Sequence, residues 1–295
     1  MKDALIIYNP SSGNEKGETI KNYLEKRLIK DFDNVKSLAT EKAGDGAKFS
    51  EQAAKDGVHS VFAIGGDGTV NEVVLGIVRS EVEKKPILGI VPGGTFNGVS
   101  RILGFSQNPR TVIRNFDFTK TTTLDSAKYN DKIFNMIFSI GDVPEALHNV
   151  SSQEKAVFSV FAYFVNIARD AIKNTHHSLR NKVEDEVLEG DYSHVAVMLS
   201  SAVFGLPIKT QVEKNDGFIH VFLLKESTLT EKIAIVPDLI SGALKKNDKI
   251  KYFKTKKIEI ESLKGVVETD LDGDKSDPLP GLIEVLPRAI EVYSK

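Results

Sequence analysis

The segment 63–72 combines three glycines with one internal carboxylate at the end of an apolar run, and reads Ala-Ile-Gly-Gly-Asp-Gly-Thr-Val-Asn-Glu. Glycines at this density let backbone N–H groups converge on an anion without obstruction by Cβ atoms. A helix starting at Thr69 would add its positive dipole end and a side-chain cap. Next to a phosphate, Asp67 would be repulsive unless a divalent metal or a proton transfer uses it. The segment therefore predicts a polyphosphate and metal site, and the alternative is a glycine turn without function.

Two further loops carry similar residues directly after apolar runs. Residues 89–97 read Gly-Ile-Val-Pro-Gly-Gly-Thr-Phe-Asn, which again ends a predicted strand in glycines, here with Thr95 as the expected helix cap. Residues 9–13 read Asn-Pro-Ser-Ser-Gly and offer amide and hydroxyl donors to phosphate oxygens, although turns in general are rich in these residues. Because ligands of parallel α/β sheets bind at the carboxyl ends of the strands, we expect these loops to serve one ligand.

The second half of the chain carries a dense acidic segment, residues 270–277, with the sequence Asp-Leu-Asp-Gly-Asp-Lys-Ser-Asp. It does not match an EF-hand loop, because Lys275 and Gly281 occupy the places of the required glycine and glutamate. An Asp-Gly hairpin turn at Asp272 is the simple structural interpretation. Phosphoryl transfer to an alcohol also needs a carboxylate placed against the acceptor hydroxyl, and this turn offers one.

The elements that must position these residues alternate between strand and helix in residues 1–125. The apolar patterns predict strands at 4–8, 35–39, 58–64 and 87–91, and helices at 17–30, 47–55, 69–79 and 97–103. This order predicts a parallel sheet with helices on both faces and a ligand site at the carboxyl ends of its strands. Each glycine-rich loop follows one of those strand ends, so the local and the global interpretations agree.

After residue 125 the pattern becomes mostly strand. We expect a hairpin of 124–129 and 132–140, a long apolar helix at 153–173, and strands at 194–200, 218–224, 250–260, 265–269, 282–286 and 289–293. The change predicts two domains, residues 1–125 and residues 126–295, with the last strand as a candidate to return to the first domain. The aromatic stripe of the 153–173 helix is expected in a core or along a pocket for an apolar ligand.

Composition narrows the class of protein. The 295 residues are 41% hydrophobic and 27% charged with a formal net charge of −2, which predicts a globular protein and gives no reason to expect nucleic-acid binding. The absence of cysteine excludes disulfides and thiolate metal sites and fits an intracellular protein. We expect no signal peptide, and no apolar run reaches the ~18–20 residues of a transmembrane helix. Any membrane contact is therefore expected to be peripheral.

The glycine segment resembles a known signature. It matches neither the P-loop nor the dinucleotide fingerprint, which would need glycine at Asn71. Gly65-Gly-Asp-Gly-Thr69 is similar to the Gly-Gly-Asp-Gly-Thr motif of the superfamily that contains diacylglycerol kinases, sphingosine kinases, NAD kinases and phosphofructokinases. The continuation Val-Asn-Glu-Val-Val resembles the lipid-kinase branch, in particular the bacterial diacylglycerol-kinase-like enzymes. The resemblance spans nearly the whole chain, because the other motifs occur in family order.

The resemblance implies an α/β N-terminal domain with a phosphofructokinase- or NAD-kinase-like parallel sheet, and a mostly β, sandwich-like C-terminal domain. It also implies an ATP site built from the three loops and from a threonine after the second strand. The residues that match nucleotide-binding positions of the family are Asn9, Pro10, Ser11, Ser12, Gly13, Thr40, Gly65, Gly66, Asp67, Gly68, Thr69, Asn71, Glu72, Gly94, Thr95 and Asn97.

The resemblance further implies a general base. In bacterial lipid kinases a late Asp-Gly-Glu turn supplies it, and the match here is Asp272-Gly-Asp274, with aspartate in place of glutamate. Asp272 is therefore the expected catalytic base. Asp67 is the alternative catalytic residue, if it takes the proton instead of organising Mg²⁺.

A second Mg²⁺ is implied before the strand at 218–224. Its expected ligands are Glu213, Asp216 and the backbone carbonyl of Phe218, and glutamate at the first place departs from the family. The alternative interpretation of residues 213–218 is a turn without a metal ion that leads into an apolar strand. Other departures are Asn14 in place of a basic residue, with Lys16 two places on, and Gly98 in place of an aspartate ahead of the matching Arg101.

These observations predict an ATP- and Mg²⁺-dependent lipid kinase that transfers the γ-phosphate to a lipid hydroxyl, that of diacylglycerol or a related lipid. Expected partners are ATP and a membrane lipid, with the protein cytoplasmic and peripheral at the inner membrane face, and a homodimer stays open. One alternative is a NAD kinase-like enzyme, although its segment after the threonine differs from Val-Asn-Glu. The other is a catalytically inactive regulator that binds nucleotide or lipid, suggested by Asn14, Gly98 and Asp274.

Overall fold

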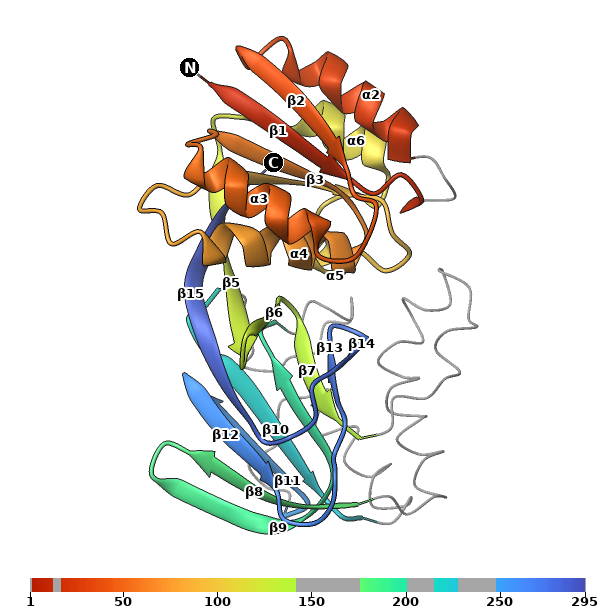
Figure 1. The fold of residues 1–295 in the computed structure, drawn as a ribbon. Helices are drawn as coiled ribbons and strands as arrows, with labels where there is room; N and C mark the ends of the chain where they lie inside the picture. Colours follow the sequence, from red (N-terminus) through yellow and green to blue (C-terminus); the bar gives the residue numbers. More distant parts are fainter. Residues whose placement is uncertain (1, 13–16, 142–175, 201–214, 228–247, 295) are drawn as a thin grey trace. The chain divides into compact units, whose positions relative to one another are not determined.

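The computed structural model describes residues 2–12, 17–141, 176–200, 215–227 and 248–294 (Figure 1). The chain divides into two compact units. Unit 1 consists of Met1–Leu124 and Arg288–Lys295, and unit 2 of Asp125–Pro287. The predicted helix at 153–173 and its aromatic stripe lie outside the described residues.

Unit 1 is built on a parallel sheet. Its strands are β1 (Asp3–Tyr8), β2 (Asn34–Ala39), β3 (Ser60–Gly65) and β4 (Ile87–Pro92), in the order β4-β3-β1-β2. The end of β15 (Gly281–Tyr293) joins beside β4 in the same direction, with Val292 opposite Leu88. The parallel sheet predicted from the alternating pattern is confirmed. Its carboxyl-end loops are those that carry the glycines.

Helices cover both faces of this sheet (Figure 1). α2 (Gly17–Leu28) and α6 (Pro109–Asn115) lie on one face, and α3 (Asp45–Lys55) and α4 (Asp67–Arg79) on the other. Every residue of β3 is buried, as expected for a strand covered on both sides. A short helix, α5 (Gly98–Ile102), follows the loop after β4. The four predicted helices are present, with shifts of up to two residues at their ends.

The helix α6 was not predicted, although its start carries a readable signal. Asn108 is the N-cap, and its side-chain oxygen accepts the N–H groups of Arg110 and Thr111 at 3.0 and 3.3 Å. Pro109 occupies the first helical position, where its fixed φ and missing N–H carry no penalty. The helix has only seven residues, which is too short for a clear apolar period.

Aromatic residues form the core on the α2 and α6 side of the sheet. Phe62 on β3 stacks on Tyr293 with ring centroids 5.8 Å apart, and Phe116 and Phe118 meet both of these rings edge-on. The buried Tyr293 hydroxyl lies 2.6 Å from Ser60 Oγ, so its polar end is satisfied. The last residues of the chain are thus part of the core of unit 1.

Unit 2 is mostly antiparallel β structure. Its further strands are β5 (Thr121–Tyr129), β6 (Lys132–Phe134), β7 (Ile137–Ile140), β8 (His177–Val183), β9 (Glu186–Met198), β10 (Ile219–Lys225), β11 (Ile250–Thr255), β12 (Lys257–Ser262), β13 (Thr269–Leu271) and β14 (Asp274–Ser276). They follow the path β14-β13-β7-β9-β8-β12-β15, with β10 beside β9, β11 beside β10, and β5 beside β15 and β6. The predicted class, an α/β domain followed by a β sandwich-like domain, is confirmed.

Several predicted strand limits in unit 2 are wrong. The hairpin arm at 132–140 is two strands, because the chain leaves the β5–β6 ladder at Asn135 and Met136 to bind Asp272. The strand at 250–260 breaks at Lys256, since β11 pairs with β10 whereas β12 pairs with β8 and β15. The segment 265–268 is not strand. Conversely, 282–286 and 289–293 belong to one long strand, β15.

Candidate functional site

The loop after β1 is shaped by its own first residue. The Asn9 side-chain oxygen accepts the Ser11 N–H at 2.9 Å, and the Asn9 carbonyl accepts the Ser12 N–H at 3.1 Å and the Ser12 hydroxyl at 2.9 Å. The Asn9 N–H donates to the Ile64 carbonyl on β3. Asn9 and Ser12 therefore hold the loop closed, while Ser11 is exposed. Gly13, Asn14 and Lys16 lie outside the described residues.

The loops after β3 and β4 touch through their glycines. The Gly93 N–H donates to the Gly65 carbonyl at 2.8 Å. A Cβ atom on Gly94 would lie 2.4 Å from Gly66 Cα, closer than real Cβ contacts allow. A Cβ on Gly93 would lie 3.0 Å from Ser12 Oγ, which belongs to the β1 loop. The structure thus brings the three predicted loops together at one edge of the sheet.

The helix caps expected from the sequence are wrong. α4 begins at Asp67 with Gly66 as its N-cap, so Thr69 lies inside the first turn, and its side chain would be 2.4 Å from a Cβ on Gly65. After β4 no helix starts at Thr95. The N-cap of α5 is Asn97, whose φ of 52° is left-handed. Both helices therefore begin without a threonine cap.

Asn97 closes the third loop on itself. Its Oδ1 accepts the Gly94 N–H at 2.8 Å and its Nδ2 donates to the Gly94 carbonyl at 2.9 Å. The side chain is buried, so both ends of the amide serve the loop. Thr95, between them, is exposed. In this loop Asn97 binds the backbone, and the Thr95 side chain is exposed.

Asp67 joins the two helix starts. Its Oδ1 accepts the Gly98 N–H at 2.7 Å. Burial raises the pKa of Asp67, and hydrogen bonds from the N–H groups of Gly98, Val99 and Asn97 oppose that rise. Gly98, which stands where the family has aspartate, thus acts through its amide. The guanidinium of Arg101 donates to the Phe96 carbonyl at 2.7 Å.

Glu72 and Thr40 hold the neighbouring segment after β2. The Glu72 carboxylate accepts the N–H groups of Gly44 and Gly46, at 2.7 and 2.9 Å. Thr40 donates its N–H to the Tyr8 carbonyl at 2.9 Å, directly before the β1 loop. The structure therefore places Thr40 beside the end of β1, and Glu72 acts as a clasp for the start of α3. Asn71 and the exposed Gly68 lie on α4 next to it.

In unit 2, Asp272 is the first residue of a tight hairpin turn between β13 and β14. Asp272 and Gly273 have φ angles of 55° and 97°, the conformation that favours Asp-Gly in two-residue hairpins. The expected Asp-Gly hairpin turn is therefore confirmed. The Asp272 carboxylate also accepts three backbone N–H groups, from Asn135 at 2.8 Å, Met136 at 2.9 Å and Ile137 at 2.7 Å.

The sequence did not predict that these three N–H groups bind Asp272. They belong to the break between β6 and β7, and nothing in residues 135–137 marks them as donors to a distant carboxylate. The result is a side chain held in one orientation by its neighbours, which is what a general base or a structural anchor both require.

The predicted ligands of a second Mg²⁺ are Glu213, Asp216 and Phe218. Glu213 lies outside the described residues. Asp216 Oδ2 lies 2.8 Å from Lys254 Nζ and 3.2 Å from His220 Nε2, and Asp216 Oδ1 accepts the Phe218 N–H. Both carboxylate oxygens are thus engaged by protein donors, one of them a cation. The described part of this set does not fit a divalent metal ion.

His220 completes this group in the core of unit 2. It is fully buried, and its Nδ1 lies 2.8 Å from the Tyr252 hydroxyl. Burial lowers the pKa of His220, which outweighs the opposing effect of Asp216. The positive charge beside Asp216 therefore comes from Lys254. The sequence offered no signal for Lys254, because only the β10–β11 pairing places it opposite His220.

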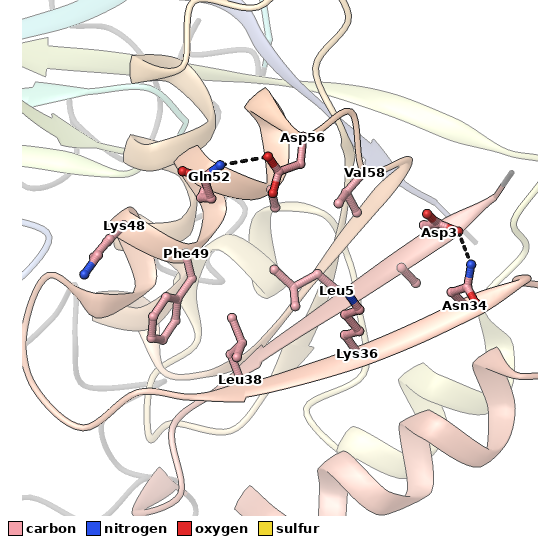
Figure 2. Close-up of a pocket in the computed structure, with 12 residues that line it drawn as sticks. Asp3, Leu5, Asn34, Lys36, Leu38, Lys48, Phe49, Gln52, Asp56 and Val58 are labelled. Carbon is pink, nitrogen blue, oxygen red and sulfur yellow. Dashed lines mark hydrogen bonds between the residues drawn. The ribbon is translucent and has the colours of Figure 1, made fainter.

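A hollow of about 560 Å³ opens between α3 and strands β1 and β2 of unit 1 (Figure 2). Leu5, Leu38 and Phe49 form apolar walls, and Lys36 and Lys48 are at its rim. None of its lining residues belongs to the three glycine-containing loops. It is therefore not part of the site predicted from the sequence.

Comparison with known families supports the resemblance over both halves of the chain. Residues 3–129 match the family described as diacylglycerol kinase catalytic domain. Residues 144–294 match the family described as YegS C-terminal NAD kinase beta sandwich-like domain. The two matches follow one another along the chain in the order predicted for the two domains.

Individual relatives match over almost their full length. A candidate lipid kinase of Streptococcus pneumoniae is 39% identical and covers 100% of this chain and 99% of that protein. A diacylglycerol kinase of Staphylococcus saprophyticus is 28% identical and covers 99% of this chain and 95% of that protein. The crystal structure of a candidate diacylglycerol kinase of Bacillus anthracis has a TM-score of 0.81 at 29% identity, over 100% of this chain and 95% of that one.

Proposed function

The chain belongs to the diacylglycerol kinase family of lipid kinases, and on that premise we propose that it transfers the γ-phosphate of ATP to a lipid hydroxyl, with diacylglycerol as the first acceptor class. The phosphate donor, the acceptor and the residues that handle them are all part of this proposal.

The meeting of three loops at the ends of β1, β3 and β4 carries the proposal. The backbones of the second and third loops approach so closely that Gly94 has no room for a side chain, and a Cβ on Gly66 would be only 3.2 Å from Gly94 Cα. Loops this tight expose N–H groups and helix starts instead of side chains, and such surfaces bind phosphate. The observation supports a nucleotide site, and the family supports ATP as its ligand.

The matched residues divide into two roles in this proposal. The side chains of Asn9, Ser12, Asn97 and Glu72 would shape the loops, because each of them binds loop backbone, and Asn97 also donates to the Gln107 side chain. The residues left to contact the nucleotide, bound as Mg²⁺–ATP, are Pro10, Ser11, Gly13, Thr40, Gly65, Gly66, Asp67, Gly68, Thr69, Asn71, Gly94 and Thr95. The Mg²⁺ of the substrate would offset the phosphate charge next to Asp67.

Asp272 would act as the general base. It would accept the proton of the lipid hydroxyl while the oxygen of that hydroxyl attacks the γ-phosphorus and ADP leaves. The three N–H groups from residues 135–137 would keep its carboxylate in one orientation. Asp67 is the alternative base, and its raised pKa makes its carboxylate a stronger proton acceptor than an ordinary aspartate.

The lipid would be met at a membrane surface. Among the described residues no helix is long and apolar enough to span a bilayer. A kinase with a lipid acceptor has to reach a substrate that is held in a bilayer. We therefore propose peripheral contact at the inner membrane face, with the acyl chains received by unit 2. Light scattering measures whether the protein is a monomer or a homodimer.

The test is an assay of the purified full chain with γ-³²P-ATP and Mg²⁺. The acceptors are short-chain diacylglycerol in mixed micelles, ceramide, monoacylglycerol, an extract of bacterial membrane lipids, and NAD in a separate tube. Labelled phosphatidic acid is the expected product. Transfer to NAD would instead support the NAD kinase-like alternative.

ATP binding measured by calorimetry separates the remaining outcomes. Binding of Mg²⁺–ATP without product from any acceptor would support the inactive regulator. A protein that neither binds Mg²⁺–ATP nor forms product would overturn both the kinase proposal and the inactive-regulator alternative. In the Asp272→Asn protein, loss of transfer with retained ATP binding assigns the base to Asp272, whereas full transfer would move that role to Asp67.

A further inference from the structure

The turn that begins β10 is centred on Asp216. Its side chain is 11% exposed. Oδ1 accepts the Phe218 N–H at 3.1 Å, which closes the turn. Oδ2 lies 2.8 Å from Lys254 Nζ and 3.2 Å from His220 Nε2. The carboxylate is thus used on both oxygens by groups of unit 2.

The β10–β11 ladder delivers Lys254 to this position. Antiparallel pairing sets Lys254 opposite His220. Its Nζ atom lies 4.7 Å from the centroid of the Phe218 ring, so the ammonium has a carboxylate on one side and an aromatic face on the other. Lys256 approaches the same ring at 6.0 Å.

A second set of hydrogen bonds ties the turn to β5. Asp125 Oδ2 accepts the Gly217 N–H at 2.8 Å, and the Asn215 side chain accepts the Asp125 N–H at 3.0 Å. Asn215 and Gly217 have φ angles of 57° and 77°, so the turn is tightly bent on both sides of Asp216. The turn is therefore held by hydrogen bonds of three side chains, those of Asp216, Asp125 and Asn215.

We propose that the Lys254 ammonium takes the place of the structural divalent cation expected at this turn, so that a half-exposed lysine of β11 balances the charge of the Asp216 carboxylate. Mg²⁺ binds oxygen at about 2.1 Å, so an ion on Oδ2 would come within about 5 Å of Nζ. It would be repelled by the ammonium and would have to displace both donors from Oδ2. The inference concerns the fold of unit 2 and holds whichever substrate the kinase uses.

The first test uses the full-length wild-type protein without nucleotide. After dialysis against EDTA, metal content is measured by mass spectrometry and Tm is recorded with EDTA and with millimolar Mg²⁺. The expected result is no divalent metal bound through Asp216 and the same Tm in both buffers. Stoichiometric Mg²⁺ that survives dialysis and is lost in Asp216→Asn would overturn the proposal. Metal retained equally by both proteins lies elsewhere and supports it.

The second test exchanges the cation. Lys254→Met removes the ammonium and leaves the Asp216 carboxylate, so Tm is expected to fall by roughly 2–4 °C. Millimolar Mg²⁺ should raise the Tm of this variant and leave that of wild type unchanged. Lys256→Met is the matched control, because Lys256 lies near the same ring without a contact to Asp216, and it should show neither effect.

Equal behaviour of the Lys254→Met and Lys256→Met proteins would overturn the proposal. Should Lys254→Met not fold, Lys254→Arg, which keeps the charge, is expected to fold and to remain insensitive to Mg²⁺. A Mg²⁺-dependent Tm in Lys254→Arg would also contradict the inference.

Discussion

Glu72 on α4 clasps Gly46 at the start of α3. Oε2 of Glu72 accepts the Gly46 N–H at 2.9 Å while Oε1 accepts the Gly44 N–H at 2.7 Å. A Cβ on Gly46 would lie only 2.8 Å from Oε2, so this contact requires glycine. Glu72, the last residue of segment 63–72, therefore holds the segment that follows Thr40. We expect Glu72 to affect the proposed nucleotide site through that segment.

Replacement of Glu72 by Gln should weaken the clasp. The glutamine amide can accept one N–H, but its NH₂ group would face the other N–H donor. We expect a loss of about 1–3 kcal/mol in the free energy of unfolding, and an increase in KM for ATP that exceeds the fall in kcat. Glu83→Gln, at an exposed residue that takes no part in the clasp, is the control and should alter neither the free energy of unfolding nor the kinetics. Equal kinetics in both variants would argue against the clasp.

Gly94→Ala should disturb the contact between the second and third loops. The added methyl group would lie 2.4 Å from Gly66 Cα, which is backbone and cannot turn away. Overpacking of this kind costs about 1–3 kcal/mol, and the displaced loops should bind Mg²⁺–ATP more weakly. Chemical denaturation and calorimetry measure the two effects. Gly190→Ala is the control, because a Cβ there meets only ordinary contacts at 3.7 Å, and it should leave both quantities unchanged.

Asp67→Asn should stabilise the nucleotide-free protein near neutral pH. Burial raises the pKa of Asp67 in the folded state, so the folded protein takes up a proton at higher pH than the unfolded chain. In wild type, the contribution of Asp67 to folding stability is complete below the pKa that Asp67 has in the unfolded chain. This contribution is lost as the pH rises through the pKa that Asp67 has in the folded protein. Asparagine does not ionise and escapes this loss.

The Tm of Asp67→Asn should therefore exceed that of wild type at about pH 7.5, and the difference should shrink as the pH falls toward about 4.5. The same variant should lose kinase activity. The exposed Asp56→Asn removes one negative charge elsewhere in unit 1 and serves as control. A Tm difference that widens at low pH would contradict the assigned direction of the pKa shift.

Asp272→Asn should reduce both turnover and stability. An asparagine amide would meet the N–H groups of residues 135–137 with a donor where the carboxylate offered an acceptor, at a cost of about 1–3 kcal/mol. If Asp272 is the base, kcat should fall by about 10²–10⁴-fold. Turnover is therefore compared at a temperature well below the lowered Tm.

Asp185→Asn provides the matched control for Asp272→Asn. Asp185 is exposed and lies in the two-residue turn between β8 and β9, so the substitution and its setting are alike. It should change neither kcat nor Tm. An Asp272→Asn protein with lowered Tm but full kcat would leave Asp272 as a structural anchor for the β6–β7 break.

The parallel sheet of unit 1 was readable from the sequence, because buried strands and amphipathic helices leave distinct apolar periods. The second half was harder. β8 and the start of β9 are polar and half exposed, so they lack an apolar run, and β11 and β12 run on without a turn signal at Lys256. Their limits depend on which partner each strand meets.

The sequence by itself determined which chemical groups are available. The types and order of Gly65, Asp67, Gly94 and Asp272 indicate a phosphate-binding family before any contact is known. Only the tertiary structure decided the task of each side chain. Asn97 and Glu72 bind backbone, and Asp216 meets Lys254 where a metal ion was expected. The reason is physical: a hydrogen bond or an ion pair needs two partners within about 3 Å, and for residues far apart in the chain that distance is set by helix packing, as for Glu72, or by strand pairing, as for Lys254.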